Sequence, residues 1–356
     1  MRRPTRTGLV AALLALSLAG AACGGSDSKT EAKGKVEPKA AEKVDLRLGY
    51  FPNVTHAAAV AGVEKGIYAE KLGPNVNLKT ATFNAGPAAV EALFAGALDA
   101  TYIGPNPAIN AFSKSNGEAI RIIAGATSGG AFLVTSPKIA TDADLKGKKI
   151  ASPQLGNTQD VALRAWLLSK GMKTSVQGGG DVSIVPQDNA QTLEQFKSGQ
   201  IAGAWVPEPW ATRLVQEAGG KIYLDERTLW PGGRFVTTHL IVRTAFLNDH
   251  PDVVEKLLAA HLAATEFVNR EPAEAQALTN AGILRITGKA IPEPVIAAAW
   301  NNLTFTFDPV ASSLRKGADD AKAVGLLDAA TKLDGIYDLS MLNKLLVDSG
   351  QAEVKG

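Results

Sequence analysis

The 356-residue sequence predicts an α/β protein with two lobes, each built on a mostly parallel, helix-covered sheet. The main observation is that strand and helix patterns alternate from about residue 44 onward. The alternation restarts after an expected crossover near Leu133–Thr135, and a strand over 237–242 can cross back. From Pro251 the chain is largely helical. We therefore expect two crossovers, a cleft between the lobes and a helical C-terminal wrap.

The first α/β unit starts where Val44, Leu46, Leu48 and Tyr50 alternate with polar residues, as in a half-buried strand. Pro87 suits the first turn of a later helix. The strands expected in this unit cover residues 44–50, 76–82, 99–103 and 121–126. The helices expected in it cover 55–65, a segment from Pro87, and a segment after Gly104-Pro105-Asn106-Pro107.

The second unit repeats this order. Its expected strands cover 148–151, 182–185 and 202–205, and its expected helices cover 159–170, 189–198 and a segment from Pro209. The predicted division is lobe 1 over residues 44–134 and 237–356, and lobe 2 over 135–236. In the C-terminal helices, Leu257, Leu258, His261, Leu262 and Thr265 share one face.

The N-terminus has the layout of a secretory signal peptide over residues 1–22. Arg2, Arg3 and Arg6 precede a short apolar run over 9–18, which is too short for a bilayer core of about 30 Å. Small residues then lead to Cys23, the only cysteine of the chain. We expect Cys23 to carry a lipid and to become the mature N-terminus at the outer face of the membrane.

The alternative for this segment is a signal peptide without lipidation and with an incidental cysteine. Gly20 stands where lipoprotein signals usually have Leu. Residues 23–43 are polar, contain no aromatic residue, and are expected to form a flexible linker after the lipid.

Charge and composition exclude several classes of protein. Loss of residues 1–22 removes three of the 37 basic residues and none of the 35 acidic ones, so the mature chain carries about one net negative charge. A basic footprint for nucleic acid is therefore absent. The four histidines form no metal-binding pair, and one cysteine allows neither a disulfide nor a zinc–thiolate site. We expect no cofactor, no metal and a monomer.

Gly, Pro, Asn and Ser gather where predicted strands end and helices begin. In parallel α/β sheets this edge binds ligands. These loops contain no Lys or Arg, and helix N-termini attract anions through free N–H groups. We interpret them as a site for a small oxyanion held by neutral donors. For any single loop, ordinary strand ends and helix caps are the alternative. The loops are 51–56, 84–87, 103–106, 128–130 and 155–160.

Catalytic patterns are weak. His56 has no nucleophile beside it in the sequence, and the segment over 282–290 fails as a phosphate loop because its spacing is wrong and no Ser or Thr follows Lys289. The densest local signal is Trp205-Val206-Pro207-Glu208-Pro209-Trp210. Its two tryptophans can form apolar walls of a cleft or belong to the core. Glu208 can contact a ligand or stabilise its own helix N-terminus.

At these loops the sequence resembles the substrate-binding lipoproteins of ABC importers in the nitrate, aliphatic-sulfonate and taurine family. The segments that carry the resemblance keep their order over roughly residues 45–345. They are Leu48-Gly49-Tyr50-Phe51-Pro52-Asn53, Phe83-Asn84-Ala85-Gly86-Pro87, Leu93-Phe94-Ala95-Gly96-Ala97-Leu98-Asp99, Leu145-Lys146-Gly147-Lys148, Gly156-Asn157-Thr158-Gln159-Asp160 and Trp205 to Trp210.

The resemblance implies a bilobal type II periplasmic-binding-protein fold that closes on a small anionic ligand and docks on the permease of an importer with ATPase subunits. It implies ligand contacts at Asn84, Gly86, Gly104, Asn106, Ser128, Asn157, Thr158 and Glu208. From the loops and the returning strand we add Asn53, His56, Gly129, Gln159, Trp210 and His239. Trp205 and Glu208 are further apart than the Trp–acid pair of taurine-type members.

The family binds several anions, so an aliphatic sulfonate is the first expectation, with taurine or nitrate next. Two other classes of function stay open at this point. One is a secreted enzyme on the same scaffold, and the other is a ligand-sensing surface lipoprotein.

Overall fold

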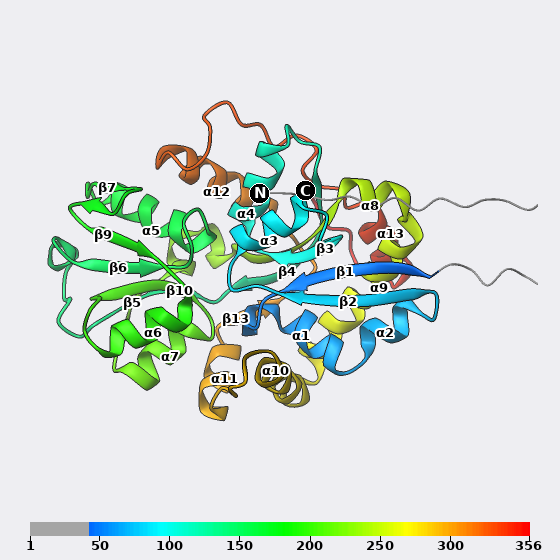
Figure 1. Ribbon diagram of the computed structural model, residues 1–356, viewed down its shortest axis with the longest axis horizontal. Helices are drawn as coiled ribbons and strands as arrows, with labels where there is room; N and C mark the ends of the chain where they lie inside the picture. Colours follow the sequence, from blue (N-terminus) through cyan, green and yellow to red (C-terminus); the bar gives the residue numbers. More distant parts are fainter. Residues whose placement is uncertain (1–42) are drawn as a thin grey trace, which may run out of the picture. The chain divides into compact units, whose positions relative to one another are not determined.

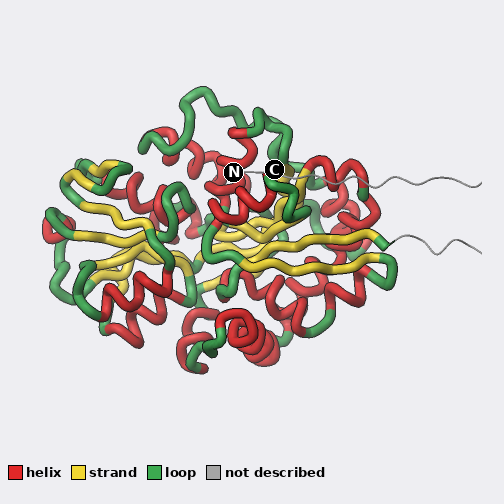
Figure 2. The backbone as a smooth tube through the Cα atoms, in the orientation of Figure 1, coloured by secondary structure: helices red, strands yellow, loops and turns green. Residues whose placement is uncertain are grey.

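Two β-sheets organise the folded part of the chain (Figures 1 and 2). The computed structural model describes residues 43–356, so the predicted signal peptide, Cys23 and nearly all of the predicted linker lie outside the described residues. Among the described residues, no helix combines the length and the apolar character needed to cross a bilayer.

The lobe 1 sheet has the strand order β13-β4-β12-β3-β1-β2. Four of its strands run in one direction, while β12 and β13 run antiparallel to their neighbours. Its strands are β1 (Val44–Tyr50), β2 (Val76–Thr82), β3 (Ala100–Ile103), β4 (Ile120–Gly129), β12 (Val236–Arg243) and β13 (Leu303–Phe305).

The lobe 2 sheet has the order β11-β5-β10-β6-β9, and only β5 runs against the other four strands. Thus each sheet is mostly parallel, as predicted, and the antiparallel strands β5 and β12 are the two that follow a crossover. The strands are β5 (Ala131–Thr135), β6 (Lys149–Ser152), β9 (Ser183–Pro186), β10 (Gly203–Pro207) and β11 (Lys221–Asp225), with the small pair β7 (Thr174–Ser175) and β8 (Gly179–Gly180) beside them.

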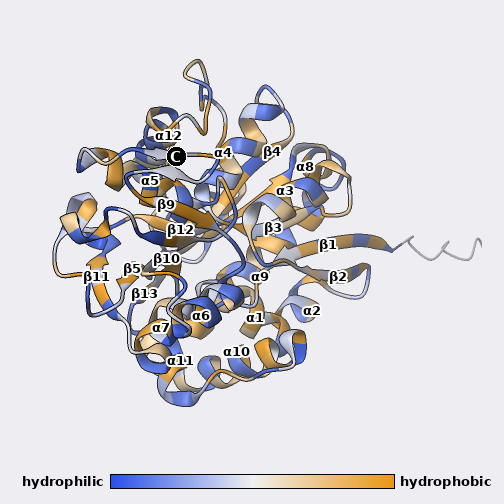
Figure 3. Ribbon diagram, turned by 60° about the vertical axis from the view of Figure 1, so that its left-hand side comes forward, coloured by the Kyte–Doolittle hydropathy of each residue, from blue (hydrophilic) through white to orange (hydrophobic). Residues whose placement is uncertain are grey.

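Helices cover both sheets, and in Figure 3 they carry both orange and blue segments, as amphipathic helices do. Most of the later ones form the predicted C-terminal wrap. The α-helices are α1 (Ala57–Glu64), α2 (Ile67–Leu72), α3 (Gly86–Phe94), α4 (Pro105–Lys114), α5 (Thr158–Ser169), α6 (Asn189–Lys197), α7 (Trp210–Ala218), α8 (Thr244–Asp249), α9 (Pro251–Arg270), α10 (Pro272–Thr287), α11 (Glu293–Trp300), α12 (Ala311–Ala323) and α13 (Ser340–Asp348).

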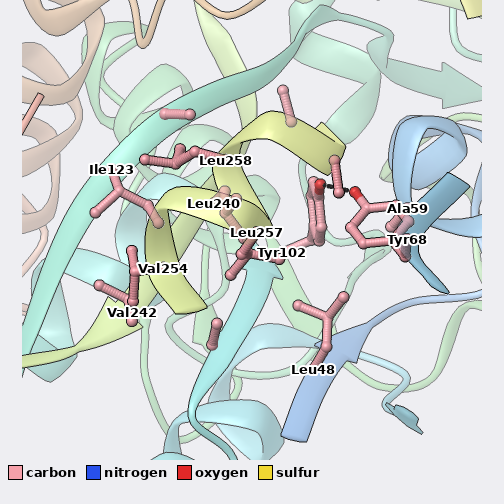
Figure 4. Close-up of a cluster of buried hydrophobic side chains, with 14 of the residues drawn as sticks. Leu48, Ala59, Tyr68, Tyr102, Ile123, Leu240, Val242, Val254, Leu257 and Leu258 are labelled. Carbon is pink, nitrogen blue, oxygen red and sulfur yellow. Dashed lines mark hydrogen bonds between the residues drawn. The ribbon is translucent and has the colours of Figure 1, made fainter. Parts of the chain in front are cut away.

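The core of lobe 1 lies on both faces of its sheet. On one face, Leu48, Tyr102 and Leu240 pack against Leu257 of α9 and Tyr68 of α2 (Figure 4). In lobe 2 the strands alternate between two clusters, with Leu133 and Trp205 on one face and Phe132 on the other. Burial on both faces explains why these strands have continuous apolar stretches.

The crossovers lie a few residues away from their predicted positions. The first is at Gly130, between β4 and β5, and not at Leu133–Thr135, because that apolar run is the buried strand β5 itself. Gly129 and Gly130 have positive φ angles of 80° and 71°, which glycine adopts without strain. The second crossover covers residues 226–235, whereas the predicted Thr237–Leu240 lies inside β12.

Two C-terminal helices connect the lobes. Helix α12 packs against α4 of lobe 1 and α5 of lobe 2, and α11 contacts α7 of lobe 2. Strands β11 and β13 have no counterpart in the sequence analysis because both are short edge strands with partly exposed residues.

Candidate functional site

A small cavity lies between the lobes, at the carboxyl ends of their parallel strands. Its free volume is about 20 Å³, which is close to the space that one water molecule needs. Lobe 1 lines it with Phe51, Asn53, Thr55, His56, Asn84, Ala85, Gly104, Thr237 and Thr238, and lobe 2 with Asn157, Thr158, Gln159, Asn189 and Pro207.

The loop after β1 brings His56 into this cavity as a neutral donor. The backbone N–H of Phe51 donates to Nδ1 of His56 at 3.3 Å, and the two rings stack with centroids 4.4 Å apart. Because Nδ1 accepts, Nε2 carries the hydrogen of the neutral ring. Burial lowers the pKa of His56 to about 3, so the ring stays uncharged at neutral pH.

Helix N-termini contribute further donors. Helix α5 starts at Thr158 after the N-cap residue Asn157, whose side chain does not cap the helix. The backbone N–H groups of Thr158 and Gln159 make no hydrogen bond to any described residue. Helices α3, α4 and α6 also start beside the cavity without a side-chain cap. Such ends carry partial positive charge and favour anions.

Three buried side-chain atoms of the lining have no hydrogen-bond partner among the described residues: Thr158 Oγ1, Asn189 Oδ1 and Thr238 Oγ1. A buried polar atom without a partner costs about 1–3 kcal/mol, which a ligand can recover. The lining set contains no charged side chain. The hydroxyls of Thr158 and Thr238 can donate, whereas the amide oxygen of Asn189 can only accept. The hydroxyl, imidazole and backbone donors of the lining outnumber this acceptor, so the cavity matches a small group with several acceptor atoms.

Within the described part of the chain, three side-chain hydrogen bonds connect the lobes around this cavity. The indole N–H of Trp210 donates to Oδ1 of Asn53 at 2.9 Å, and Nδ2 of Asn84 donates to Asp188 at 3.3 Å. Nδ2 of Asn302 donates to Oε1 of Glu208 at 2.7 Å. These bonds hold the two lobes together around the cavity.

Seven of the fourteen predicted ligand residues line the cavity. They are Asn53, His56, Asn84, Gly104, Asn157, Thr158 and Gln159. Gly104 is placed where a Cβ atom would overlap with Oγ1 of Thr158 from the other lobe. A glycine at this position thus lets the lobes approach each other.

The other seven predicted residues are outside the lining. Nδ2 of Asn106 donates to the carbonyl of Gly317 at 3.0 Å, and Nε2 of His239 contacts the carbonyl of Pro309 at 3.0 Å. Gly86 packs against Pro107, while Ser128 and Gly129 end β4 at the crossover.

Glu208 and Trp210 stand behind the cavity wall. The carboxylate of Glu208 accepts from the Thr212 backbone N–H at 3.1 Å and the Thr212 hydroxyl at 2.8 Å, besides Asn302. Burial raises the pKa of Glu208, and these hydrogen bonds oppose the rise. Its position fits the helix-stabilising alternative for Glu208.

The lining also contains residues that the sequence analysis does not single out. Thr237 and Thr238 enter because β12 runs antiparallel to β3, so the start of β12 lies at the end of β3. Asn189 starts α6 directly after β9, which is the same strand-to-helix signal as at the predicted loops. Phe51, Thr55, Ala85 and Pro207 complete this set.

Comparison with known proteins places the chain in a family. Residues 39–283 match the NMT1-like family. The taurine-binding periplasmic protein of Escherichia coli (strain K12) is 27% identical over 226 residues, which cover 64% of this chain and 67% of that protein.

Two solved structures have a similar fold. The alkanesulfonate-binding protein SsuA from Xanthomonas axonopodis pv. citri has a TM-score of 0.65 and 21% identity, covering 81% of this chain and 96% of that one. The periplasmic nitrate-binding protein NrtA from Synechocystis PCC 6803 has a TM-score of 0.68 and 18% identity, covering 82% and 84%. These matches confirm the predicted bilobal fold and the resemblance to the nitrate, sulfonate and taurine binding proteins. By its match over most of its length, the chain belongs to the NMT1-like family.

Proposed function

We propose that this protein is the extracytoplasmic substrate-binding component of an ABC importer and that it captures a small organic oxyanion, with an aliphatic sulfonate as the first candidate. The observation that carries the proposal is the cavity between the lobes, whose unpartnered donors include the hydroxyls of Thr158 and Thr238. The names of its relatives, which bind taurine, alkanesulfonate and nitrate, support the same class of ligand.

Neutral donors suit an anion that has to be released again. A sulfonate head offers three acceptor oxygens, and hydrogen bonds to a charged acceptor contribute roughly 1.5–3 kcal/mol each. A buried Lys or Arg beside the anion would create an ion pair that resists separation. The cavity as it stands has room for about one water, so a sulfonate head requires the lobes to lie slightly further apart, while donors of both lobes still face it.

A neighbouring groove supports an organic ligand over nitrate. The groove has a volume of about 580 Å³ and shares Asn84 with the cavity. Trp210, which also lines the groove, is bonded to Asn53 of the cavity. Most of its lining is apolar, so a carbon chain attached to the head group can lie there. The apolar lining residues are Pro52, Ala190, Leu193, Pro209, Trp210, Ile283, Ile286, Ala290 and Ile291, and the lining also contains the charged residues Glu194, Arg213 and Lys289.

The enzyme alternative has less support. In the described residues, the lining of the cavity combines Thr, Asn, Gln and one neutral His, and it contains no carboxylate to activate His56 as a base. Binding at one ligand per protein, with the ligand recovered unchanged, would separate a receptor from an enzyme.

The membrane anchor belongs to the same proposal. Cys23 would carry the lipid, and residues 23–43 would tether the lobes so that they can reach a permease. The test is Cys23→Ser with cell fractionation. The variant is expected in the soluble extracytoplasmic fraction, and a variant that stays membrane-bound contradicts the anchor.

Ligand binding is tested with a panel of alkanesulfonates, taurine, nitrate, sulfate, bicarbonate and aromatic acids. A ligand at about 100 times its Kd adds about 2.7 kcal/mol to the free energy of unfolding. The melting temperature should then rise by several degrees. Calorimetry on the compounds that raise it gives stoichiometry and Kd.

Matched variants connect the binding to the cavity. Thr158→Val keeps the shape of the side chain and removes one unpartnered hydroxyl. The sulfonate that binds best in the panel should therefore bind about tenfold more weakly to this variant. Thr265→Val is the control, because this buried hydroxyl also lacks a partner but lies in α9 among residues that do not line the cavity. A melting shift only with cationic or neutral compounds would reject the oxyanion proposal.

A further inference from the structure

The amide of Asn53 is held in one orientation by a residue of the opposite lobe. Asn53 is 6% exposed, lines the cavity from lobe 1, and accepts the indole N–H of Trp210 on its Oδ1 at 2.9 Å. An indole nitrogen can only donate, so this contact identifies the oxygen of the amide. Nδ2, which makes no hydrogen bond to any described residue, is left to donate.

Packing and a cation–π contact hold the Trp210 side chain in place. It is the first residue of α7, and its ring packs against the apolar cluster of lobe 2. The guanidinium of Arg213 lies over the ring, 4.7 Å from its centroid. Glu217 fixes Arg213 through two hydrogen bonds of 2.7 and 3.2 Å. The indole N–H therefore reaches Asn53 from a rigid position.

His56 lies in the same loop as Asn53. A contact inside lobe 1 leaves only its Nε2–H available, as a donor. The backbone N–H of Phe51 occupies its Nδ1, and this contact does not depend on the other lobe. The orientation of the Asn53 amide, in contrast, depends on a partner in lobe 2. When the lobes separate, the bond to Trp210 breaks and the Asn53 amide is free to turn either its oxygen or its nitrogen toward the ligand.

We propose that Trp210 is a positioning residue that makes the closed site selective for fully deprotonated oxyanions. On closure its indole N–H fixes the Asn53 amide so that only a donor faces the ligand at this point. A sulfonate, with acceptors alone, satisfies that donor. An oxyanion that keeps a hydroxyl, such as a monoprotonated phosphonate, must turn this hydroxyl elsewhere or face donor against donor. The inference rests on the proposed oxyanion binding.

The test compares alkanesulfonates with alkylphosphonates of the same chain length, at a mildly acidic pH where the phosphonate keeps one proton. Trp210→Phe retains an aromatic ring below Arg213 and removes the N–H. Because the variant also loses a bond between the lobes, both ligands should bind more weakly, but the sulfonate should lose at least about fivefold more affinity than the phosphonate, through faster dissociation. The selectivity ratio should therefore fall about fivefold or more.

Further variants distinguish a loss of Asn53 orientation from a general loss of stability. Asn53→Ala should lower the ratio to a similar extent, and the double variant should lower it no further, because both changes remove one linked contact. Trp166→Phe removes an indole from the core of lobe 2 and should change the melting temperature but leave the ratio intact.

The outcomes are distinct. Equal losses for both ligands in Trp210→Phe, or no loss for either, overturn the positioning role. Additive effects of Trp210→Phe and Asn53→Ala overturn it as well. If the wild-type protein binds none of the oxyanions, the proposed function itself fails, and that result is visible before any variant is made.

Discussion

The carboxylate of Asp160 accepts the backbone N–H of Gly156 at 3.0 Å, so a buried acid of α5 shapes the loop that precedes its own helix. Asp160 is fully buried, and it also pairs with Arg164 one turn later at 3.1 Å. The hydroxyl of Ser152, at the end of β6, donates to its other oxygen at 2.7 Å. The loop it holds carries Asn157 and Thr158 into the cavity. Site geometry thus depends on an ion pair outside the cavity lining.

Replacing Asp160 with Asn should destabilise the protein by about 3–5 kcal/mol, because the charge of Arg164 remains buried without its partner. Chemical denaturation measures the loss. Asp144→Asn, at an exposed capping box, is the control and should cost about 1 kcal/mol.

If Asp160→Asn does not fold, Ser152→Ala provides a milder test of the same loop. It removes one hydrogen bond to the carboxylate and should weaken sulfonate binding by roughly two- to tenfold. An unchanged Kd in a folded Ser152→Ala variant would mean that the loop holds its shape without this support.

Gly104 gives a direct test of closure. A Cβ atom at this position would overlap with Oγ1 of Thr158, across the lobe boundary. Gly104→Ala should therefore lower ligand affinity at least tenfold and change the free energy of unfolding much less. Small-angle scattering should show less compaction on addition of the ligand.

The crowding at Gly104 can be relieved in a second variant. Thr158→Ala removes the overlapping oxygen, so the double variant should close again, with affinity equal to that of Thr158→Ala alone. Separate, additive losses would mean that Gly104 matters for a reason other than contact with Thr158.

Glu226 makes stability depend on pH. It lies at the start of the second crossover, 1% exposed, and accepts the indole N–H groups of Trp205 at 2.7 Å and Trp230 at 3.3 Å. Burial raises the pKa of Glu226 to about 7, against which these bonds and the charge of Lys316 act, while Asp320 adds to the rise.

Proton linkage gives the direction of this pH dependence. The folded state keeps the proton of Glu226 up to about pH 7, whereas the unfolded chain loses it near pH 4.5. The contribution of Glu226 to stability is therefore greatest below pH 4.5 and falls by about 3 kcal/mol as the pH rises to 7. Glu226→Gln should remove this slope in denaturation curves measured from pH 4 to 8. A variant with the slope of the wild type would assign the pH dependence to other groups.

Much of the fold follows from the sequence because its strands and helices have strong local signals. The limits of β1 and β2 agree with the predicted strands, since apolar alternation and the flanking turns coincide there. The predicted crossovers differ from the observed ones because a buried strand and a crossover can have the same apolar composition. Only the backbone shows that Gly130 makes the turn.

Some residues of the candidate site could be predicted from the sequence, and others could not. The loops after β1 and before α5 could be predicted because parallel strands present their carboxyl ends at one edge. Thr237 and Thr238 could not, since their place depends on β12 entering the sheet in the opposite direction. His239 follows them in the chain, but its side chain contacts Pro309 in the interior of lobe 1. Strand direction and side-chain alternation are properties of the assembled sheet.

Glu208 distinguishes a ligand with an amine from one without. Its carboxylate is 1% exposed, and it is occupied by the Thr212 N–H, the Thr212 hydroxyl and Asn302 of the other lobe. Three donors already occupy most of the acceptor positions of this carboxylate, and the residue is outside the cavity lining. Glu208 therefore supports the start of α7 and the closed arrangement.

Glu208→Gln should consequently affect taurine and ethanesulfonate alike, because these two sulfonates differ only in the ammonium group. The amide NH2 of Gln would face the Thr212 N–H, donor against donor, and should destabilise the protein by about 1–3 kcal/mol. Calorimetric titration should give the same factor of weakening for both ligands, within about twofold. Asn302→Ala, which removes only the bond between the lobes, should weaken both ligands equally as well. The opposite result would be a loss of tenfold or more in affinity for taurine, with the affinity for ethanesulfonate unchanged in Glu208→Gln. The carboxylate would then contact the ligand amine, and ligand recognition would be its main role.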